Sequence, residues 1–291
     1  MGGVSSEPAP TRFALTLAYD GGPFHGWARQ SQLGSVQQSL EEALELILRM
    51  PTRTVVAGRT DTGVHARGQV VHLDITEQAL SRLVTRDGGL DAEATLVRRL
   101  NSILNASTSG AVLVREARVV PPGFDARFSA LWRSYTYTIA DGMDRWDPLR
   151  RGDTLFHPRE LDVEAMQQEA AALVGLHDFL SYCKPRQGAT TIRELQELLV
   201  QRHEEDGLIR VHLRADAFCH HMVRSIVGAL ISVGEAKREP GWAHARLQER
   251  VRDAKTTMVA GHALVLEAVG YPEDHTAGER AQATRVRRKV Q

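Results

Sequence analysis

Apolar and polar positions along the first fifty residues predict a strand followed by a helix. The segment RFALTLAYDG (residues 12–21) predicts a strand that ends at a Gly-Gly turn. The segment SVQQSLEEALELILRM (residues 35–50) predicts a helix, because its apolar residues recur at the spacing of one helical face: Val36, Leu40, Leu44, Ile47 and Leu48. Ser35 and Gln38 are spaced as in a capping box and therefore mark the start of this helix.

Four further elements complete the first half of the chain. A short strand is expected around residues 54–57, followed by the loop GRTDTGVHARG (58–68). In the next strand, QVVHLDI (69–75), Val71, Leu73 and Ile75 alternate with polar neighbours. A helix around 96–104 and the strand AVLVREARVV (111–120) follow. The order is β-α-β-β-α-β, the ferredoxin-like arrangement.

The second half repeats this order without obvious sequence repetition. Its elements are the strand RSYTYTIA (133–140), the helix LDVEAMQQEAAALVG (161–175), a hairpin at 193–202 and 208–215, the helix FCHHMVRSIVGALISVG (218–234) and the strand ALVLEAVGY (263–271), with an extra helix at 242–254 before the last strand. The expected fold class is α+β, with two ferredoxin-like (RRM-like) halves whose antiparallel sheets lie side by side around a central cleft.

The domain boundaries follow from these elements. The first half spans 12–121 and carries the 58–68 loop, the second spans 122–272, and the linker PPGFDARFSALW (121–132) is rich in turn residues. Residues 1–11 are expected to form a disordered tail. Residues 273–291 form a basic tail, with five basic residues and no acid from Arg280 onward, also expected to be disordered. Such a tail is either simply solvated or adds weak electrostatic affinity for a polyanion.

Charge and cysteine content restrict the function only modestly. With 36 basic and 36 acidic residues, a polyanionic partner must be held by a local basic surface. Arginine outnumbers lysine, which suits phosphate and base contacts but can equally reflect codon usage. Cys183 and Cys219 match no zinc or CxxC spacing, which argues for a reducing compartment and against a disulfide framework. A cytoplasmic protein is expected, and the longest apolar run, SIVGALISVG, is too short to span a membrane.

Asp61 is the first candidate for chemistry, because it lies in the GRTDTG loop after a short strand. Gly58 and Gly63 beside it permit unusual dihedral angles and close backbone approach. Taken alone, such an aspartate is most often a turn residue that bonds its own backbone. A metal site of Asp61 with His65, His72 and Asp74 is the alternative, but no HExxH motif or paired-cysteine spacing supports it.

Two other groups stand out in the second half. His220 and His221 lie at a predicted helix start, where adjacent side chains diverge by roughly 100°, so they are not expected to chelate one ion. With Arg224 they form a polar helix end that suits a phosphate or carboxylate, unless it is merely solvated. Tyr135 and Tyr137 share one face of a strand, where they either stack on nucleobases or belong to the core.

Several segments, taken together and in order, resemble the tRNA pseudouridine synthase A family. They are LAYDGGPFHGWARQ, SVQQSLEEAL, AGRTDTGVHARGQVVH, FDARFSALWRSYTY, FLSY, FCHHMVRSIVGAL and LVLEAVGYP, and they extend from about residue 12 to residue 272. The GRTDTGVHA motif is highly specific, and HHMVRSIVG follows in register. The resemblance implies the pseudouridine synthase fold.

The resemblance also implies an activity and roles for individual residues. The expected enzyme is an isomerase that converts uridine to pseudouridine in the tRNA anticodon arm, at positions 38, 39 and 40, as a homodimer without cofactor or metal. Asp61 matches the catalytic aspartate and Arg59 the arginine that occupies the space of the flipped nucleotide. Tyr135 matches the tyrosine that stacks on the target base, and Arg224 the arginine that pairs with the carboxylate.

The chain departs from the family pattern in two places. Ala263 stands where the family more commonly has glycine, and TRDGGLDAEA (85–94) is idiosyncratic. Another RNA position is the nearest alternative target. The rival functions from other classes are a non-catalytic RNA-binding protein and a metal-dependent hydrolase built on Asp61, His65 and His72.

Overall fold

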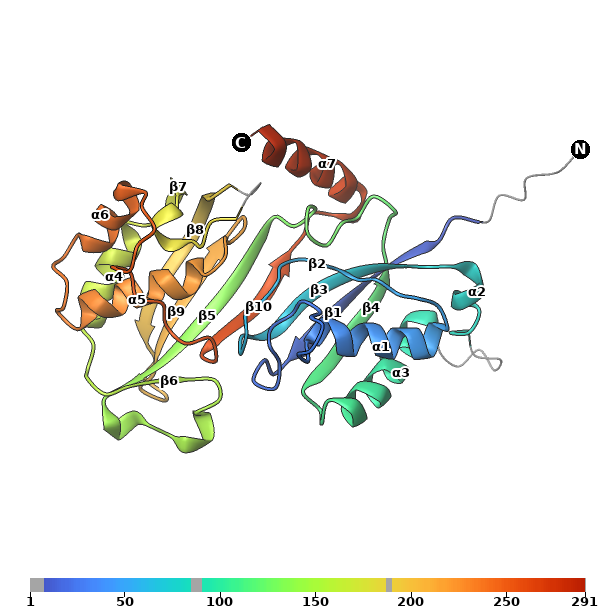
Figure 1. The fold of residues 1–291 in the computed structure, drawn as a ribbon, viewed down its shortest axis with the longest axis horizontal. Helices are drawn as coiled ribbons and strands as arrows, with labels where there is room; N and C mark the ends of the chain where they lie inside the picture. Colours follow the sequence, from blue (N-terminus) through green and yellow to red (C-terminus); the bar gives the residue numbers. More distant parts are fainter. Residues whose placement is uncertain (1–7, 85–90, 187–189, 291) are drawn as a thin grey trace, which may run out of the picture.

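One continuous sheet carries both halves of the chain (Figure 1). The computed structural model describes residues 8–84, 91–186 and 190–290, so most of the N-terminal tail and the 85–90 part of the idiosyncratic segment lie outside the described residues. The main path of the sheet is β4-β1-β3-β10-β5-β9-β8-β7, with β2 on β3 and β6 on β5. No helix within the described ranges is long and apolar enough to cross a membrane.

The first half has the predicted ferredoxin-like order, with strands arranged β4-β1-β3-β2. Its elements are β1 (Thr11–Tyr19), α1 (Val36–Leu48), β2 (Val55–Val56), β3 (His65–Ile75), α2 (Glu77–Leu80), α3 (Ala92–Ser107) and β4 (Val112–Val119). The Ser35 side chain accepts the main-chain N–H of Gln38 as predicted, but the Gln38 side chain bonds Glu42, so the capping box is one-sided.

The second half has the same order, β10-β5-β9-β8, and adds elements that the sequence pattern did not indicate. Its strands are β5 (Trp132–Asp141), β6 (Leu155–His157), β7 (Gly175–Asp178), β8 (Ile192–Arg202), β9 (Ile209–Ala215) and β10 (Leu264–Gly270). Its α-helices are α4 (Val163–Ala171), α5 (Met222–Gly234), α6 (Trp242–Glu249) and α7 (Asp274–Val290). Short 3-10 turns lie at Met143–Arg145, Pro148–Arg150 and Leu180–Tyr182.

The halves meet where β10 pairs in parallel with the start of β3, at Val265–His65 and Leu266–Ala66. Strand β2 pairs with the far end of the same edge, opposite His72 and Val71. The chain between β2 and β3 therefore leaves the sheet at the junction of the halves. Ala263 is fully buried just before β10, and its carbonyl accepts the N–H of Thr138.

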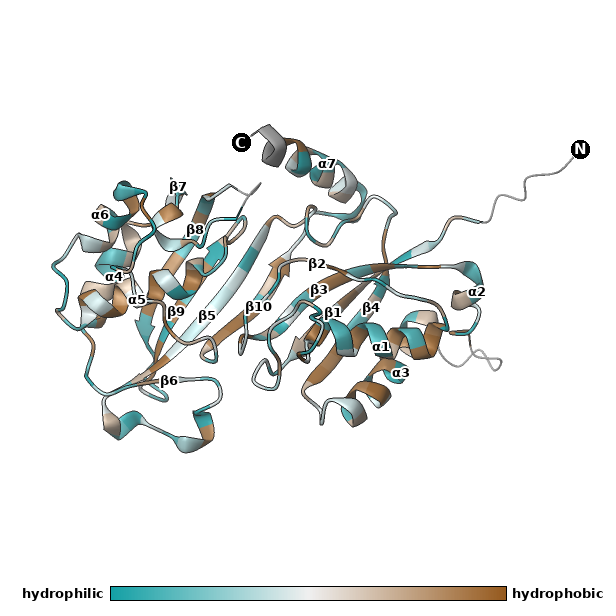
Figure 2. Cartoon of the chain, in the orientation of Figure 1, coloured by the Kyte–Doolittle hydropathy of each residue, from teal (hydrophilic) through white to brown (hydrophobic). Residues whose placement is uncertain are grey.

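Two apolar clusters cover opposite faces of the sheet. The larger one lies under the α1–α3 and α4–α5 helix pairs, and Figure 2 shows apolar and polar bands alternating along α1 and α3. Ala14 and Val70 alternate with Leu15 and Val71 of that core and so point to the other face. There they join Phe124, Ala126 and Ala277.

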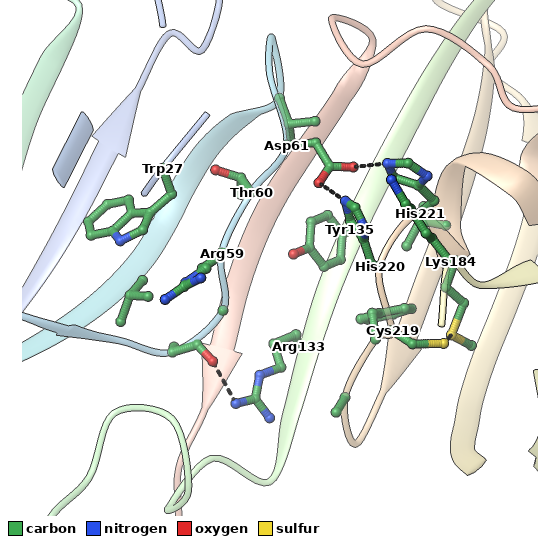
Figure 3. A pocket seen from close by; sticks show the side chains of 18 of the residues that line it. Trp27, Arg59, Thr60, Asp61, Arg133, Tyr135, Lys184, Cys219, His220 and His221 are labelled. Atoms are coloured by element: carbon green, nitrogen blue, oxygen red, sulfur yellow. Dashed lines mark hydrogen bonds and ion pairs between the residues drawn. The ribbon is translucent and has the colours of Figure 1, made fainter. Parts of the chain in front are cut away.

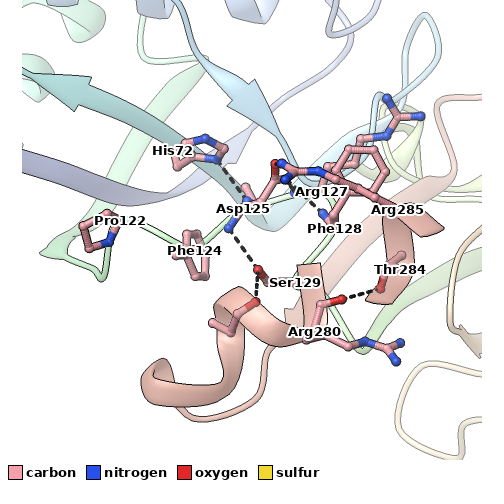
Figure 4. Close-up of polar contacts among 12 residues, drawn as sticks. His72, Pro122, Phe124, Asp125, Arg127, Phe128, Ser129, Arg280, Thr284 and Arg285 are labelled. Carbon is pink, nitrogen blue, oxygen red and sulfur yellow. Dashed lines mark hydrogen bonds and ion pairs between the residues drawn. The ribbon is translucent and has the colours of Figure 1, made fainter. Parts of the chain in front are cut away.

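Helix α7 closes this second cluster, which corrects the expectation of a disordered C-terminal tail. Ala277 and Ala281 are buried, and the Ala277 carbonyl accepts the Ser129 hydroxyl (Figure 4). Arg285 pairs with Asp125 at 2.5 Å. Apolar side chains and an ion-pair partner offered by the linker thus order a segment whose own sequence is polar.

Candidate active site

The loop between β2 and β3 forms one wall of a pocket of about 520 Å³ at the junction of the halves. Asp61 lies in a turn of this loop, where its carbonyl accepts the N–H of Val64, and its carboxylate is about a quarter exposed. Gly63 has φ 76° and so needs glycine, as expected. At Gly58 a Cβ atom would meet open space, so nothing within the described protein requires glycine there.

A buried hydrogen-bond chain braces the loop from below. The amide of Gln69 donates to the Gly58 carbonyl (2.8 Å) and to the Tyr19 hydroxyl (3.2 Å), which leaves the hydroxyl to donate to Thr60 Oγ1 at 2.8 Å. Burial raises the pKa of Tyr19 to about 12, so it remains a donor at neutral pH. A Cβ at Gly21 would lie 2.1 Å from the Val64 carbonyl, so the 20–27 loop also packs directly on the Asp61 loop.

The carboxylate of Asp61 faces three potential cations from the start of α5, and Figure 3 shows two of them, His220 and His221. Arg224 Nη1 lies 3.4 Å from Oδ2, His220 Nε2 lies 3.3 Å from Oδ1, and His221 Nε2 lies 3.7 Å from Oδ2. Arg224 also donates from Nε to the Val259 carbonyl at 2.8 Å, which fixes its direction. The structure therefore brings together Asp61 and Arg224, as expected from the resemblance.

The expectation that the two histidines diverge is wrong. It assumed that both lie on the helix, but α5 begins at Met222, and His221 precedes it in the left-handed region, with φ 71°. This turn brings the imidazole centroids to 3.8 Å and points both rings at Asp61. Burial lowers the pKa of each histidine, partly opposed by the Asp61 charge, so neutral rings are favoured.

Tyr135 and Arg59 line the pocket in different ways. The Tyr135 ring is only 8% exposed, packs edge-on against Phe218 at 5.1 Å, and has its hydroxyl pKa raised by burial. Tyr137 on the same strand face is fully buried in the core. Arg59 is exposed, and its guanidinium has no hydrogen-bond or ion-pair partner within the described ranges. In Figure 3 it lies on the Trp27 side of the loop, away from the carboxylate.

The pocket is also lined by cationic side chains that the sequence did not single out. They are Arg127, Arg133, Lys184, Arg186 and Arg193. The buried guanidinium of Arg133 donates to the carbonyls of Ala57, Arg127 and Asp216 and so ties the loop, the linker and the end of β9 together. Only its position on the aromatic strand β5, two residues before Tyr135, could have drawn attention to it. Asp61 is the one carboxylate among the described lining residues.

The metal set considered from the sequence is not assembled. His65 Nδ1 accepts the N–H of Gly21, which leaves Nε2–H to donate to the His262 carbonyl at 2.7 Å. His72 Nδ1 accepts the N–H of Ala126, and Asp74 pairs with Arg12. His65, His72 and Asp74 thus make structural contacts and do not form a metal site with Asp61.

The two cysteines lie beside the site, and the structure joins them in a disulfide, contrary to the expectation from their spacing. Cys183 and Cys219 have Cα atoms 5.7 Å apart; Cys219 lines the pocket, and Cys183 precedes the lining residue Lys184. The N–H of Lys184 donates to the His220 carbonyl at 2.9 Å, so the 180–186 segment and the turn before α5 are tied twice.

The fold and site define a class: a protein of twin ferredoxin-like halves with a loop carboxylate in an arginine-lined, anion-attracting pocket. A family model described as tRNA pseudouridine synthase matches residues 170–272. Similar proteins from several bacteria carry the name tRNA pseudouridine synthase A. That of Leifsonia xyli subsp. xyli is 47% identical, covering 94% of this chain and 96% of the relative. That of Frankia casuarinae is 48% identical and covers 94% of this chain and 94% of the relative. That of Streptomyces griseus subsp. griseus is 44% identical and covers 96% of this chain and 95% of the relative. The chain belongs to the tRNA pseudouridine synthase A family.

Proposed function

We propose that this protein isomerises uridine to pseudouridine in the anticodon arm of tRNA, at positions 38, 39 and 40, with Asp61 as the essential carboxylate. The observation that carries the proposal is the pairing of Asp61 with Arg224 in a pocket whose other charged lining residues, among those described, are cationic. Such a pocket suits a phosphate backbone, and the single carboxylate suits covalent or electrostatic work on one nucleotide.

The reaction is an isomerisation and needs no external oxidant or reductant. The bond from C1′ to N1 breaks, the base turns, and a bond from C1′ to C5 forms, while C5 loses a proton and N1 gains one. In the proposed reaction Asp61 attacks the sugar or the base, or removes the proton. Arg224 holds the carboxylate in place and sets a positive charge beside it.

The target uridine must leave the stacked helix to reach Asp61, and unstacking costs a few kcal/mol. We assign Arg59 to the space that the nucleotide vacates, because its guanidinium is exposed and without a described partner. We assign Tyr135 to the face of the extruded base, since it lies at the pocket floor below Asp61 (Figure 3).

The partner and the assembly follow from the same resemblance. The proposed substrate is tRNA, the proposed assembly a homodimer in which one tRNA contacts both subunits, and the proposed location the cytoplasm. Sedimentation of the protein alone and with tRNA tests the assembly.

The decisive experiment compares Asp61→Asn with Asp144→Asn, an exposed carboxylate outside the pocket. Unmodified tRNA is incubated with each protein, and pseudouridine is mapped by nucleotide. We expect the wild type and Asp144→Asn to modify positions 38 to 40, and Asp61→Asn to bind tRNA without product. A wild-type protein that binds tRNA but never forms pseudouridine would be a binding protein. Product at other positions alone would retain the isomerase and refute the anticodon assignment.

A further inference from the structure

Asp61, His220 and His221 also form a preassembled set of metal ligands. Their ligand atoms all lie within 4.8 Å of one another, the one such group of three found in the part of the chain that the structure describes. We propose that this set binds a divalent transition metal ion of the zinc type, and that the bound ion blocks the catalytic carboxylate. The proposal rests on the proposed function only for the consequence of binding.

The spacing of the ligand atoms fits a metal ion. A zinc ion about 2.0–2.1 Å from each nitrogen or oxygen in tetrahedral geometry holds two ligand atoms roughly 3.3 Å apart. Here His220 Nε2 lies 3.3 Å from Oδ1 of Asp61 and His221 Nε2 lies 3.7 Å from Oδ2. Two imidazoles and a carboxylate are ligands that zinc accepts, and the open pocket leaves further positions to water.

The surroundings indicate an ion that binds reversibly and is not a resident cofactor. Arg224, Lys184 and Arg186 place positive charge near the histidines and oppose a cation. His220 Nδ1 is buried with no described hydrogen-bond partner, whereas the second nitrogen of a metal-bound histidine is normally held by an acceptor. The ion would occupy the place that the target uridine must reach, so metal and RNA compete.

Binding is tested on the protein without RNA, because tRNA phosphates bind metal ions themselves. Metal-free protein is titrated with Co²⁺, followed by the visible absorption of the ion, and Zn²⁺ is then added to displace it. We expect one saturable site. His220→Asn, His221→Asn and Asp61→Asn should each weaken binding by about 10- to 100-fold or more. His244→Asn, at an exposed histidine on α6, is the matched control and should bind like the wild type.

At a fixed concentration of free metal ion, a tRNA anticodon arm should reduce Co²⁺ binding by the wild type, and Zn²⁺ should slow pseudouridine formation in competition with tRNA. Absence of one-to-one binding, variants that bind as tightly as the wild type, or indifference to tRNA would each overturn the proposal. These outcomes leave the synthase proposal standing, because pseudouridine is mapped in metal-free buffer. Conversely, Co²⁺ binding by a wild-type protein that makes no pseudouridine would support the metal site and refute the synthase proposal.

Discussion

Arg224 Nη1 lies 3.4 Å from Oδ2 of Asp61, across 163 positions of sequence and across the junction of the two halves. The same guanidinium donates to the Val259 carbonyl on the way into β10. One side chain thus joins the Asp61 loop of the first half to the helix and closing strand of the second. Any change in how the halves meet changes the setting of the carboxylate.

Replacing Arg224 should therefore impair turnover more than tRNA binding. We expect Arg224→Ala to lower the rate of pseudouridine formation on the order of 100-fold or more, because the developing charge loses a fixed partner. Arg224→Lys keeps the charge but cannot contact both Asp61 and the Val259 carbonyl, so its rate should lie between those of the wild type and Arg224→Ala. Single-turnover rates and tRNA dissociation constants are the measurements, with Arg159→Ala as an exposed control. Equal losses in binding and rate would contradict this role.

A second prediction concerns His72 and acid stability. Burial lowers the pKa of His72, with Arg12 and Arg285 adding to this and Asp125 and Asp74 opposing it, while Nδ1 accepts the Ala126 N–H. The unfolded chain then binds a proton more readily than the folded one. The contribution of neutral His72 to the free energy of unfolding is fully present above the ordinary pKa of 6.5. It is lost as the pH falls from 6.5 through the lowered pKa of the folded protein.

The matched variant is His72→Asn, whose side-chain oxygen can accept the same N–H but does not titrate. Between pH 7.5 and 5, the free energy of unfolding should fall further for the wild type than for His72→Asn. The difference should be about 1.4 kcal/mol for each unit by which folding lowers the pKa of His72. Denaturant titrations at several pH values measure the difference. Parallel curves for the two proteins would exclude His72 as the titrating group.

The cysteine pair gives a third prediction. Oxidant should convert the thiols of Cys183 and Cys219 to an intramolecular disulfide, counted by thiol titration after unfolding. With a sequence separation of 36, the bond should raise the free energy of unfolding by about 2–4 kcal/mol. Cys183→Ser should abolish the difference between oxidised and reduced protein. Disulfide-linked dimers in place of the internal bond would show that the two sulfurs do not meet in solution.

The sequence predicted the repeated β-α-β-β-α-β order because alternation and helical spacing are local properties of each segment. It could not predict the parallel pairing of Val265 with His65, since that contact depends on the packing of two finished halves. Likewise the motif around Asp61 made this carboxylate a candidate from the sequence, whereas the joint approach of His220 and His221 depends on one left-handed residue before the helix. The order of α7 also depends on distant partners, such as Asp125 for Arg285.

Helix α7 therefore provides the sharpest test of a feature that the sequence alone misjudged. Ending the chain after Pro272 removes Ala277 from the second cluster together with the buried Ala281, uncovers Phe124 and leaves Asp125 without Arg285. The free energy of unfolding should fall on the order of 2–4 kcal/mol from lost apolar burial and hydrogen bonds.

The Asp125 carboxylate also accepts the N–H groups of Arg127 and Phe128, so its release should loosen the linker that presents Arg127 to the pocket and weaken tRNA binding (Figure 4). Thermal unfolding and tRNA affinity are compared with a chain ending after Arg285, which keeps the Asp125 contact. If the tail were only solvated, the chain ending after Pro272 would keep an unchanged melting temperature. That result would show that α7 does not contribute to the fold.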